Sequence, residues 1–526
     1  GSIGVLLLFL ILFRSPRQLL LLLLPMAAGV GSGFAVGALV FGRVHGLTIA
    51  FGASLVGVCV DYAVHVICHR SLSPQGPALA TSERRLWAGI WLGGGTTLAG
   101  LLGLAWTSFP GLREIAWVAF VGVLVALALT RLLLPAWLPA QLEPAPLPRR
   151  LSAWLYTLLG VIGRRRRPLA LLSLLALGLC AAGLPRLVWA DSLSALSHLD
   201  PALLAEDEAV RARVGRMDGS RMVIALGADS AEALARNELA ADALEAAVAA
   251  GELEAFRSLR VMLPSEASQR RRLEALRADR SLPARLDAAF ERAGFVSGTF
   301  APFFDSLAHA PEPLALPELL DSSLGAAARP FRVQLEDRVA ILLFVRGVRA
   351  SDALEARLGA LEGVHYLDQQ ALFTRAYGGF RERTLQQIGL GLIFVLLLLL
   401  LRYRRLGPAL AALLPAVLAA LATLGLLGHL GLEANLMHLV ALLLVLSIGV
   451  DYGVFVIEHR DAPEALGPTL FAMGVACLTT LLGFGLLALS EDPPLRSLGI
   501  AVTLGVLLAA WLAPLSLWIV GRGPAR

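Results

Sequence analysis

The chain alternates long apolar runs with short polar turns, and one long polar segment, residues 186–384, interrupts this pattern. An apolar run of roughly 18 or more residues is long enough to cross the hydrocarbon core of a bilayer as a helix. The pattern predicts a polytopic α-helical membrane protein with eleven spans, at residues 1–13 (a shortened span), 18–42, 47–67, 87–107, 114–138, 168–185, 385–401, 408–430, 436–457, 469–489 and 496–520.

The same five-span block occurs twice, at residues 1–138 and 385–520. Val60-Asp61-Tyr62 matches Val450-Asp451-Tyr452, and both motifs continue to a His-Arg pair. Parallel repeats of this kind are a common way to build transporters, with the coupling site at the repeat interface. The sequence therefore predicts a duplicated helix bundle. Further matched positions are Pro25 and Pro415, Thr96-Thr97 and Thr479-Thr480, Pro110 and Pro493, and Arg113 and Arg496.

The two halves differ in what precedes them. A further span and the polar segment come before the second block, whereas Gly1 falls opposite Gly391, inside the equivalent span. We therefore expect an N-terminally truncated chain that lacks a first span and a first extracytoplasmic domain. The predicted domains are a first-half bundle (1–139), a cytoplasmic linker (140–167), the first span of the second half (168–185), an extracytoplasmic α/β domain (186–384), a second-half bundle (385–520) and a cytoplasmic tail (521–526).

The polar segment carries the pattern of a small mixed α/β domain. Strand–helix–strand units of its kind suit a split βαβ module. The expected elements are a strand at 221–226, a helix near 230–250, a hairpin at 331–335 and 339–345, a helix near 351–361, a strand at 364–367 and a helix at 368–383 that runs into the next span.

Composition and charge support a membrane location. The chain is 57% hydrophobic with a mean hydropathy of +0.72, too apolar for a soluble enzyme of this size, and all 45 basic residues are arginine. Most arginines near the spans lie on one set of turns, which the positive-inside rule places in the cytoplasm. The net charge of +5 therefore reports orientation and does not indicate nucleic-acid binding. We expect a bacterial inner-membrane protein with its large domain in the periplasm.

The linker has an amphipathic stretch, Leu151 to Ile162, before the arginines at 164–167. It suits a helix lying on the anionic inner leaflet, and a plain topogenic signal explains it equally well. The four cysteines fall in or at the ends of spans, so they predict no disulfide framework and no metal site. They are Cys59, Cys68, Cys180 and Cys477.

Asp61 and Asp451 are the candidate functional residues. A carboxylate in mid-membrane costs roughly 2.5–3.5 kcal/mol on insertion scales, so it is usually retained for function. Two at matched positions suggest a paired proton site, in which Asp61 approaches Tyr452 and Asp451 approaches Tyr62. A tyrosine hydroxyl can donate to an ionised carboxylate and accept from a protonated one. A structural buried hydrogen bond is the other interpretation.

Several polar residues near this pair are candidate accessories. His65 either relays protons or is a packing residue, and a solvated role is expected for Glu458 and His459. The threonines either bond across helices to the acidic site or bond back to their own helices; they are Thr96, Thr97, Thr479 and Thr480. Glycines at 29, 33 and 37 predict a close helix–helix approach.

These motifs resemble the resistance-nodulation-division (RND) superfamily across essentially the whole chain. The Val-Asp-Tyr form is similar to the MMPL branch of lipid exporters. Two further runs, 46–52 and 109–113, resemble the predicted-exporter group of aryl polyene and xanthomonadin gene clusters. The resemblance implies a proton-relay role for Asp61, Tyr62, Asp451 and Tyr452. Multidrug efflux is disfavoured because the drug-efflux branch typically uses adjacent aspartates and a lysine.

The favoured function is export of a lipid or lipid-like molecule driven by the proton motive force, with protons as the coupling ion and no cofactor or metal. Membrane lipids and the lipid-like substrate are the expected partners; a periplasmic carrier, biosynthetic partners and the oligomeric state stay open. An intramembrane aspartyl protease is disfavoured because its Tyr-Asp and Gly-x-Gly-Asp motifs are not matched here. A non-transporting sensor or assembly scaffold is the alternative function.

Overall fold

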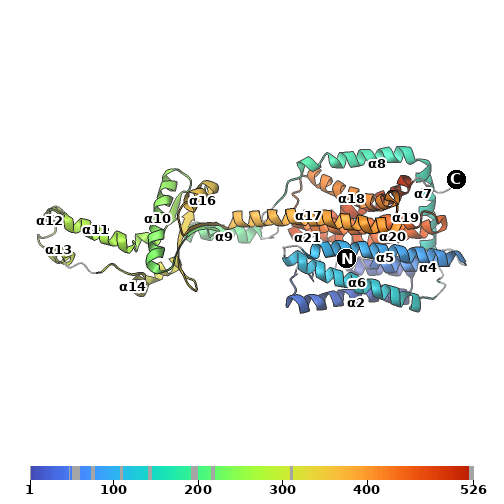
Figure 1. Ribbon diagram of the computed structural model, residues 1–526, viewed down its shortest axis with the longest axis horizontal. Coiled ribbons are helices and arrows are strands. Elements are labelled where there is room, and N and C mark those ends of the chain that lie inside the picture. Colours follow the sequence, from blue (N-terminus) through green and yellow to red (C-terminus); the bar gives the residue numbers. More distant parts are fainter. Residues whose placement is uncertain are drawn as a thin grey trace. The chain divides into compact units, whose positions relative to one another are not determined.

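The computed structural model describes residues 2–46, 48–49, 60–72, 77–106, 110–139, 142, 145–190, 200–214, 219–308 and 312–520. The chain divides into two compact units, each considered separately. The helical unit comprises Gly1–His198 and Thr374–Arg526, and the sheet unit comprises Leu199–Phe373 (Figure 1).

Nine helices within the described residues are long and apolar enough to cross a membrane. Of the eleven predicted spans, the one at 1–13 is a shorter apolar helix, Ile3–Phe13, and the one at 47–67 lies partly outside the described residues. The prediction of a polytopic α-helical protein is confirmed.

The helical unit consists of helices that run side by side, with α7 lying across one end (Figure 1). Its first part contains α1 (Ser2–Phe13), α2 (Pro16–Phe41), α4 (Val60–Leu72), α5 (Pro77–Ala105), α6 (Pro110–Trp137), α7 (Pro146–Arg164) and α8 (Arg166–Ala181). Its second part contains α17 (Gln369–Tyr403), α18 (Leu406–His429), α19 (Leu436–Glu458), α20 (Pro463–Phe484), α21 (Pro493–Leu512) and α22 (Ser516–Ile519).

The predicted repeat is visible in the helix boundaries and contacts. Pro110 begins α6 and Pro493 begins α21, where the missing proline N–H is not needed. Pro25 and Pro415 lie inside the matching helices α2 and α18. The helices that carry the aspartates pack against the other half, α4 on α20 and α19 on α5. Each acid is therefore placed at the interface between the two halves.

Helix α19 is the most enclosed of the candidate spans. Its apolar window is 89% buried, against 17% for α17. A helix that is apolar on all sides must be covered on all sides by protein or lipid, and α18, α21 and α5 pack around this one. The side chains of Asp451 and Tyr452 are consequently shielded by protein.

Glycines bring α2 and α6 together as predicted. A Cβ at Gly33 would lie 2.5 Å from the carbonyl oxygen of Val118, and one at Gly37 would lie 2.7 Å from the Val118 side chain. Only a residue without a Cβ permits this approach. The prediction of a close helix pair at these glycines is confirmed.

The sheet unit is a five-stranded antiparallel sheet with order β2-β4-β1-β5, to which β3 is added on β4. This connectivity is the ferredoxin-like β-α-β-β-α-β arrangement, so the split βαβ prediction is confirmed. The strands are β1 (Arg221–Gly227), β2 (Ala255–Arg257), β3 (Arg332–Gln334), β4 (Val339–Arg346) and β5 (Val364–Asp368). The helices are α9 (Pro201–Val214), α10 (Ser230–Ala249), α11 (Glu266–Ala278), α12 (Leu282–Arg292), α13 (Ala301–Ala308), α14 (Leu316–Asp321), α15 (Gly325–Ala328) and α16 (Ser351–Gly359).

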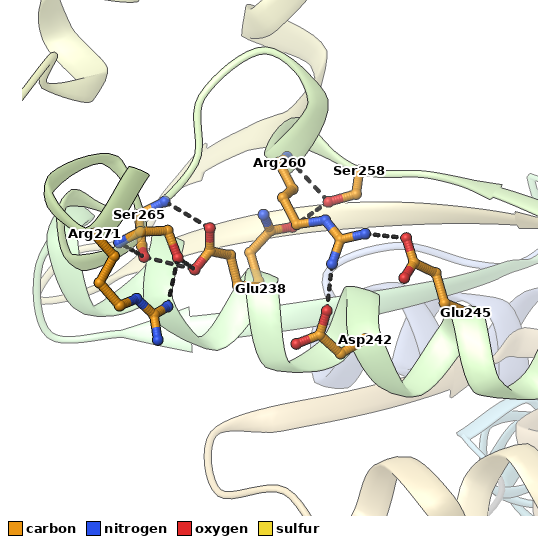
Figure 2. A network of polar contacts seen from close by, with 9 residues as sticks. Glu238, Asp242, Glu245, Ser258, Arg260, Ser265 and Arg271 are labelled. Atoms are coloured by element: carbon orange, nitrogen blue, oxygen red, sulfur yellow. Dashed lines mark hydrogen bonds and ion pairs between the residues drawn. The ribbon is translucent and has the colours of Figure 1, made fainter. Parts of the chain in front are cut away.

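A polar network joins α10 to the start of α11 (Figure 2). Glu238 accepts from the backbone N–H of Ser265 at 3.0 Å, from the Ser265 hydroxyl at 2.6 Å and from the Ser268 hydroxyl at 2.7 Å. Burial alone would raise the pKa of Glu238, but these hydrogen bonds and the charge of Arg260 outweigh burial and lower that pKa. The ionised carboxylate thus holds the N-terminus of α11 in place.

Candidate functional site

The two Asp-Tyr motifs meet inside the helical unit. Asp61 and Asp451 are 7% and 6% exposed, and Tyr62 and Tyr452 are 1% and 2% exposed. The two carboxyl groups interact electrostatically. Both acids are therefore enclosed by protein, and their carboxyl groups lie close enough to interact electrostatically.

One cross-repeat pair is formed directly. The Tyr62 hydroxyl donates to Asp451 Oδ2 over 3.3 Å, although the two residues are 389 positions apart. Tyr62 Oη also lies 3.4 Å from Thr97 Oγ1, and Thr97 Oγ1 lies 2.7 Å from Ser447 Oγ. A chain of hydroxyls therefore leads from Asp451 through Tyr62 and Thr97 to Ser447.

The matching pair in the other half is not equivalent. The Tyr452 hydroxyl is buried with no hydrogen-bond partner among the described residues, and Asp61 is bound by Thr479 instead. Thr479 Oγ1 lies 3.4 Å from Asp61 Oδ1. The expected Asp61–Tyr452 bond is absent from the described part of the chain, although the two groups interact electrostatically. The site is asymmetric despite the symmetric sequence.

A glycine makes room for the Asp451 carboxyl. A Cβ at Gly93 of α5 would lie 2.5 Å from Asp451 Oδ1, closer than real Cβ contacts come. This same oxygen is buried and has no hydrogen-bond partner among the described atoms. Gly93 thus lets an incompletely paired carboxyl pack directly against the backbone of α5, where a proton or a water is needed to complete its bonding.

The four accessory threonines are all buried, but they act differently. Thr97 and Thr479 bond to the Asp-Tyr residues, whereas Thr96 bonds back to the Gly93 carbonyl at 2.8 Å. Thr479 also bonds back, to the Ala476 carbonyl at 2.8 Å. Thr97 therefore bonds across helices to the site, Thr96 bonds back to its own helix, and Thr479 does both. Ser447, which the sequence places on the same helix face as Asp451, lies beside Thr97 and also belongs to the site.

A second buried polar group lies toward the arginine-rich end of the same helices. His65 stacks on Phe455 with ring centroids 3.8 Å apart, and His69 lies 4.8 Å from His459. His459 is fully buried, so the expectation of a solvated role for it is wrong. The side chain of Glu458 is 6% exposed and bonds to Arg402 at 2.9 Å, so the same expectation fails for Glu458. These positions are covered because α4 and α19 each pack against the opposite half. Their distance along the sequence from the middle of the span does not reveal this burial.

No group of three or more His, Cys, Asp or Glu residues in the described part of the chain could hold a metal ion. The polar groups of this site are hydroxyls, carboxyls and imidazoles. Their chemistry is the exchange of protons and of hydrogen bonds.

Comparison with known proteins agrees with the motifs. Residues 1–150 match the model of the MMPL family, a stretch that includes Asp61 and Tyr62. Over this stretch the chain is similar to the MMPL family. No curated protein matches the chain by sequence.

In fold, the chain is similar to SecDF, a translocon-associated membrane protein from Thermus thermophilus, with a TM-score of 0.53 and 16% sequence identity. The similarity covers 99% of this chain and 60% of SecDF, so the chain spans about three fifths of the length of that protein. The prediction of an RND-type fold is confirmed by this likeness.

Proposed function

We propose that this protein is an MMPL-type transporter driven by the proton motive force, and that it exports a lipid or lipid-like molecule. The observation that carries the proposal is the hydrogen bond from Tyr62 to Asp451, which joins the two halves through a buried carboxyl. Protonation of this carboxyl removes the negative charge to which Tyr62 donates. A change of proton occupancy therefore changes the contact between the halves.

We infer that the two acids share one proton. Asp451 accepts from the Tyr62 hydroxyl at 3.3 Å, and Asp61 accepts from the Thr479 hydroxyl at 3.4 Å. The Thr479 hydroxyl also donates to the Ala476 carbonyl over a shorter distance of 2.8 Å, so Asp61 has the weaker donor. Asp61 is therefore the acid that more readily keeps the proton, with the proton load belonging to the pair.

A cavity offers a route to this site from the arginine-poor end. It has a volume of about 40 Å³, lies between α5, α6 and α19, and is lined by Thr97 and Ser447 among apolar side chains. Because Thr97 contacts Tyr62, a proton arriving by water in this cavity reaches Asp451 through hydroxyls. Each proton moving inward supplies roughly 2.3 kcal/mol per 100 mV, enough to bias a packing change between two states.

The substrate class rests on the MMPL match and on the Val-Asp-Tyr form of both motifs. Within that class we propose the predicted-exporter group of aryl polyene and xanthomonadin clusters, an inner-membrane location, and a periplasmic sheet unit through which substrate passes. Association with a translocon, as named for SecDF, is a competing role for the same fold.

The test substitutes Asp61→Asn and Asp451→Asn in the complete protein. Each should abolish proton-driven flux in proteoliposomes and shift lipid from the outer to the inner membrane in cells, because asparagine keeps the shape but cannot exchange a proton. Asp352→Asn, on an exposed residue of the sheet unit, is the control and should behave as wild type. Unchanged flux and lipid distribution in both site variants would instead favour a scaffold.

A further inference from the structure

The repeated motifs contain a second matched residue that the proposed function does not use. His69 follows Asp61 by eight positions, and His459 follows Asp451 by eight positions. The two histidines are 1% and 0% exposed, and their ring centroids lie 4.8 Å apart at a tilt of 31°. A second pair of matched titratable groups therefore meets across the repeat interface, two helical turns from the acids.

The hydrogen bonds assign the nitrogen that carries the proton in each neutral ring. The Thr469 hydroxyl donates to the Ala465 carbonyl at 2.7 Å, so its oxygen accepts from His69 Nε2 at 3.2 Å. His459 Nδ1 lies 2.9 Å from the Phe455 carbonyl, which can only accept. Nδ1 of His69 and Nε2 of His459 are therefore the proton-accepting nitrogens. His459 Nε2 is buried and has no hydrogen-bond partner among the described atoms.

His65 lies between the aspartate pair and the pair formed by His69 and His459. It is one helical turn beyond Asp61 and one turn before His69 on α4, so all three side chains share a face. Its ring stacks on Phe455, the residue whose carbonyl binds His459, and its Nδ1 is buried without a hydrogen-bond partner in the described region. Every pair among the three imidazoles interacts electrostatically.

Charged groups of the surrounding helices lie close enough to His459 to interact with it. Arg85 of α5 and Glu464 of α20 both act electrostatically on His459. Glu458 of α19 is bound by Arg402 of α17, so it is already neutralised. Glu464 thus remains as an acceptor at the arginine-rich end, while Arg85 opposes a lasting positive charge on His459. These surroundings suit a proton that passes through the rings rather than one that stays.

We propose that the histidine layer, defined as His65, His69 and His459, carries protons between the aspartate pair and the arginine-rich end. The inference rests on the proposed function and adds the path by which protons leave the aspartate pair. A proton leaves an aspartic carboxyl, which becomes a carboxylate, and binds a lone pair of the layer to form an imidazolium. Loss of that N–H proton to Glu464 or to water restores the neutral rings. Repulsion between neighbouring imidazoliums limits the layer to one proton at a time.

The variants for the test keep the hydrogen bonds that the imidazoles make but remove their ability to bind a second proton. In His69→Gln the side-chain amide can replace Nε2 at Thr469, and in His459→Asn it can replace Nδ1 at the Phe455 carbonyl. Proton flux is recorded in proteoliposomes of the complete protein, with an entrapped pH dye under an imposed potential. We expect the double variant to slow flux at least tenfold and to alter the dependence of the flux on pH, because the two substituted side chains bind no proton.

His438→Asn is the matched control, because His438 is 3% exposed on the same helix but lies at its opposite end. It should keep the wild-type rate and pH profile. If Asp61→Asn abolishes flux while the histidine double variant keeps both rate and profile, the histidines only pack, and the inference fails while the proposed function stands.

A flux in the wild type no greater than in Asp61→Asn would refute the proposed function itself. The histidines are then judged by ring ¹⁵N resonances of labelled protein. One imidazolium that appears as the pH is lowered, and is lost in the double variant, would still support a proton-binding layer. Rings that stay neutral at every pH at which the protein remains folded would overturn it.

Discussion

At the scale of single residues, equal sequence motifs have acquired unequal surroundings. Tyr62 has both an acid and a hydroxyl as neighbours, whereas the Tyr452 hydroxyl has no hydrogen-bond partner among the described atoms. A transporter that shares one proton between two acids needs such a difference, because identical sites would give no preferred order of loading. The asymmetry is therefore a functional property of the proposed site.

Removal of each tyrosine hydroxyl tests this difference. Tyr62→Phe deletes the donor to Asp451 and should reduce proton flux at least tenfold, since a hydrogen bond to a charged group contributes about 1.5–3 kcal/mol. Tyr452→Phe removes a hydroxyl without a hydrogen-bond partner in the described structure and should reduce flux less than threefold. Initial rates in proteoliposomes decide the matter, and equal losses in the two variants would contradict the asymmetry.

Gly93 provides a second test at this scale. In Gly93→Ala the added methyl group would meet Asp451 Oδ1 at 2.5 Å, so the carboxyl must shift away from α5 and from its bond to Tyr62. We expect a tenfold or greater loss of flux with the helices still folded by circular dichroism. Gly95→Ala, two residues along the same helix with open space around its Cβ, should retain normal flux. A normal rate in Gly93→Ala would show that the position of this carboxyl is not critical.

At the scale of elements, close backbone approach fixes how helices pair. Gly33 of α2 lies against the Val118 carbonyl, so Gly33→Ala forces the helices apart and should cost about 1–3 kcal/mol. Gly31→Ala meets open space and should be neutral or stabilise by up to about 1 kcal/mol, because alanine favours a helix over glycine. Thermal unfolding of both variants in detergent measures the contrast. Similar midpoints would mean that this contact does not limit stability.

The sheet unit offers a pH-dependent contact. The pKa of Glu238 is lowered in the folded protein, so its contribution is complete above the unfolded value of about 4.3 and disappears as pH falls through the folded value. Glu238→Gln should therefore speed amide exchange of α11 several-fold at pH 7, and the gap from wild type should close below pH 4. Glu274→Gln, exposed on α11 itself, is the control. A gap that persists at low pH would assign the effect to shape and not to charge.

At the scale of the whole molecule, the sequence predicted the architecture but only part of the site. Duplication placed Asp61 and Asp451 at one interface because the repeat sets their depth in the bundle and their direction. The partners depend on how the halves cross, and no periodicity gives that crossing. His459 was therefore assigned to solvent, although it is buried and its ring lies against His69 of α4. The eight-residue spacing shared by His69 and His459 was the available signal.

Orientation remains a prediction at this scale, and it decides the direction of proton flow. The arginine run 164–167 joins α7 to α8 and is exposed, so the positive-inside rule places it in the cytoplasm and the sheet unit on the opposite side. Cysteines introduced at Arg165 and at Ser323 of the sheet unit report this directly in a protein whose Cys59 is replaced by serine, because Cys68, Cys180 and Cys477 are buried. In intact spheroplasts an impermeant maleimide should label Ser323→Cys and not Arg165→Cys. The reverse pattern would turn the proposed exporter round in the membrane, with the histidine layer as the entrance for protons and the Thr97 cavity as their exit.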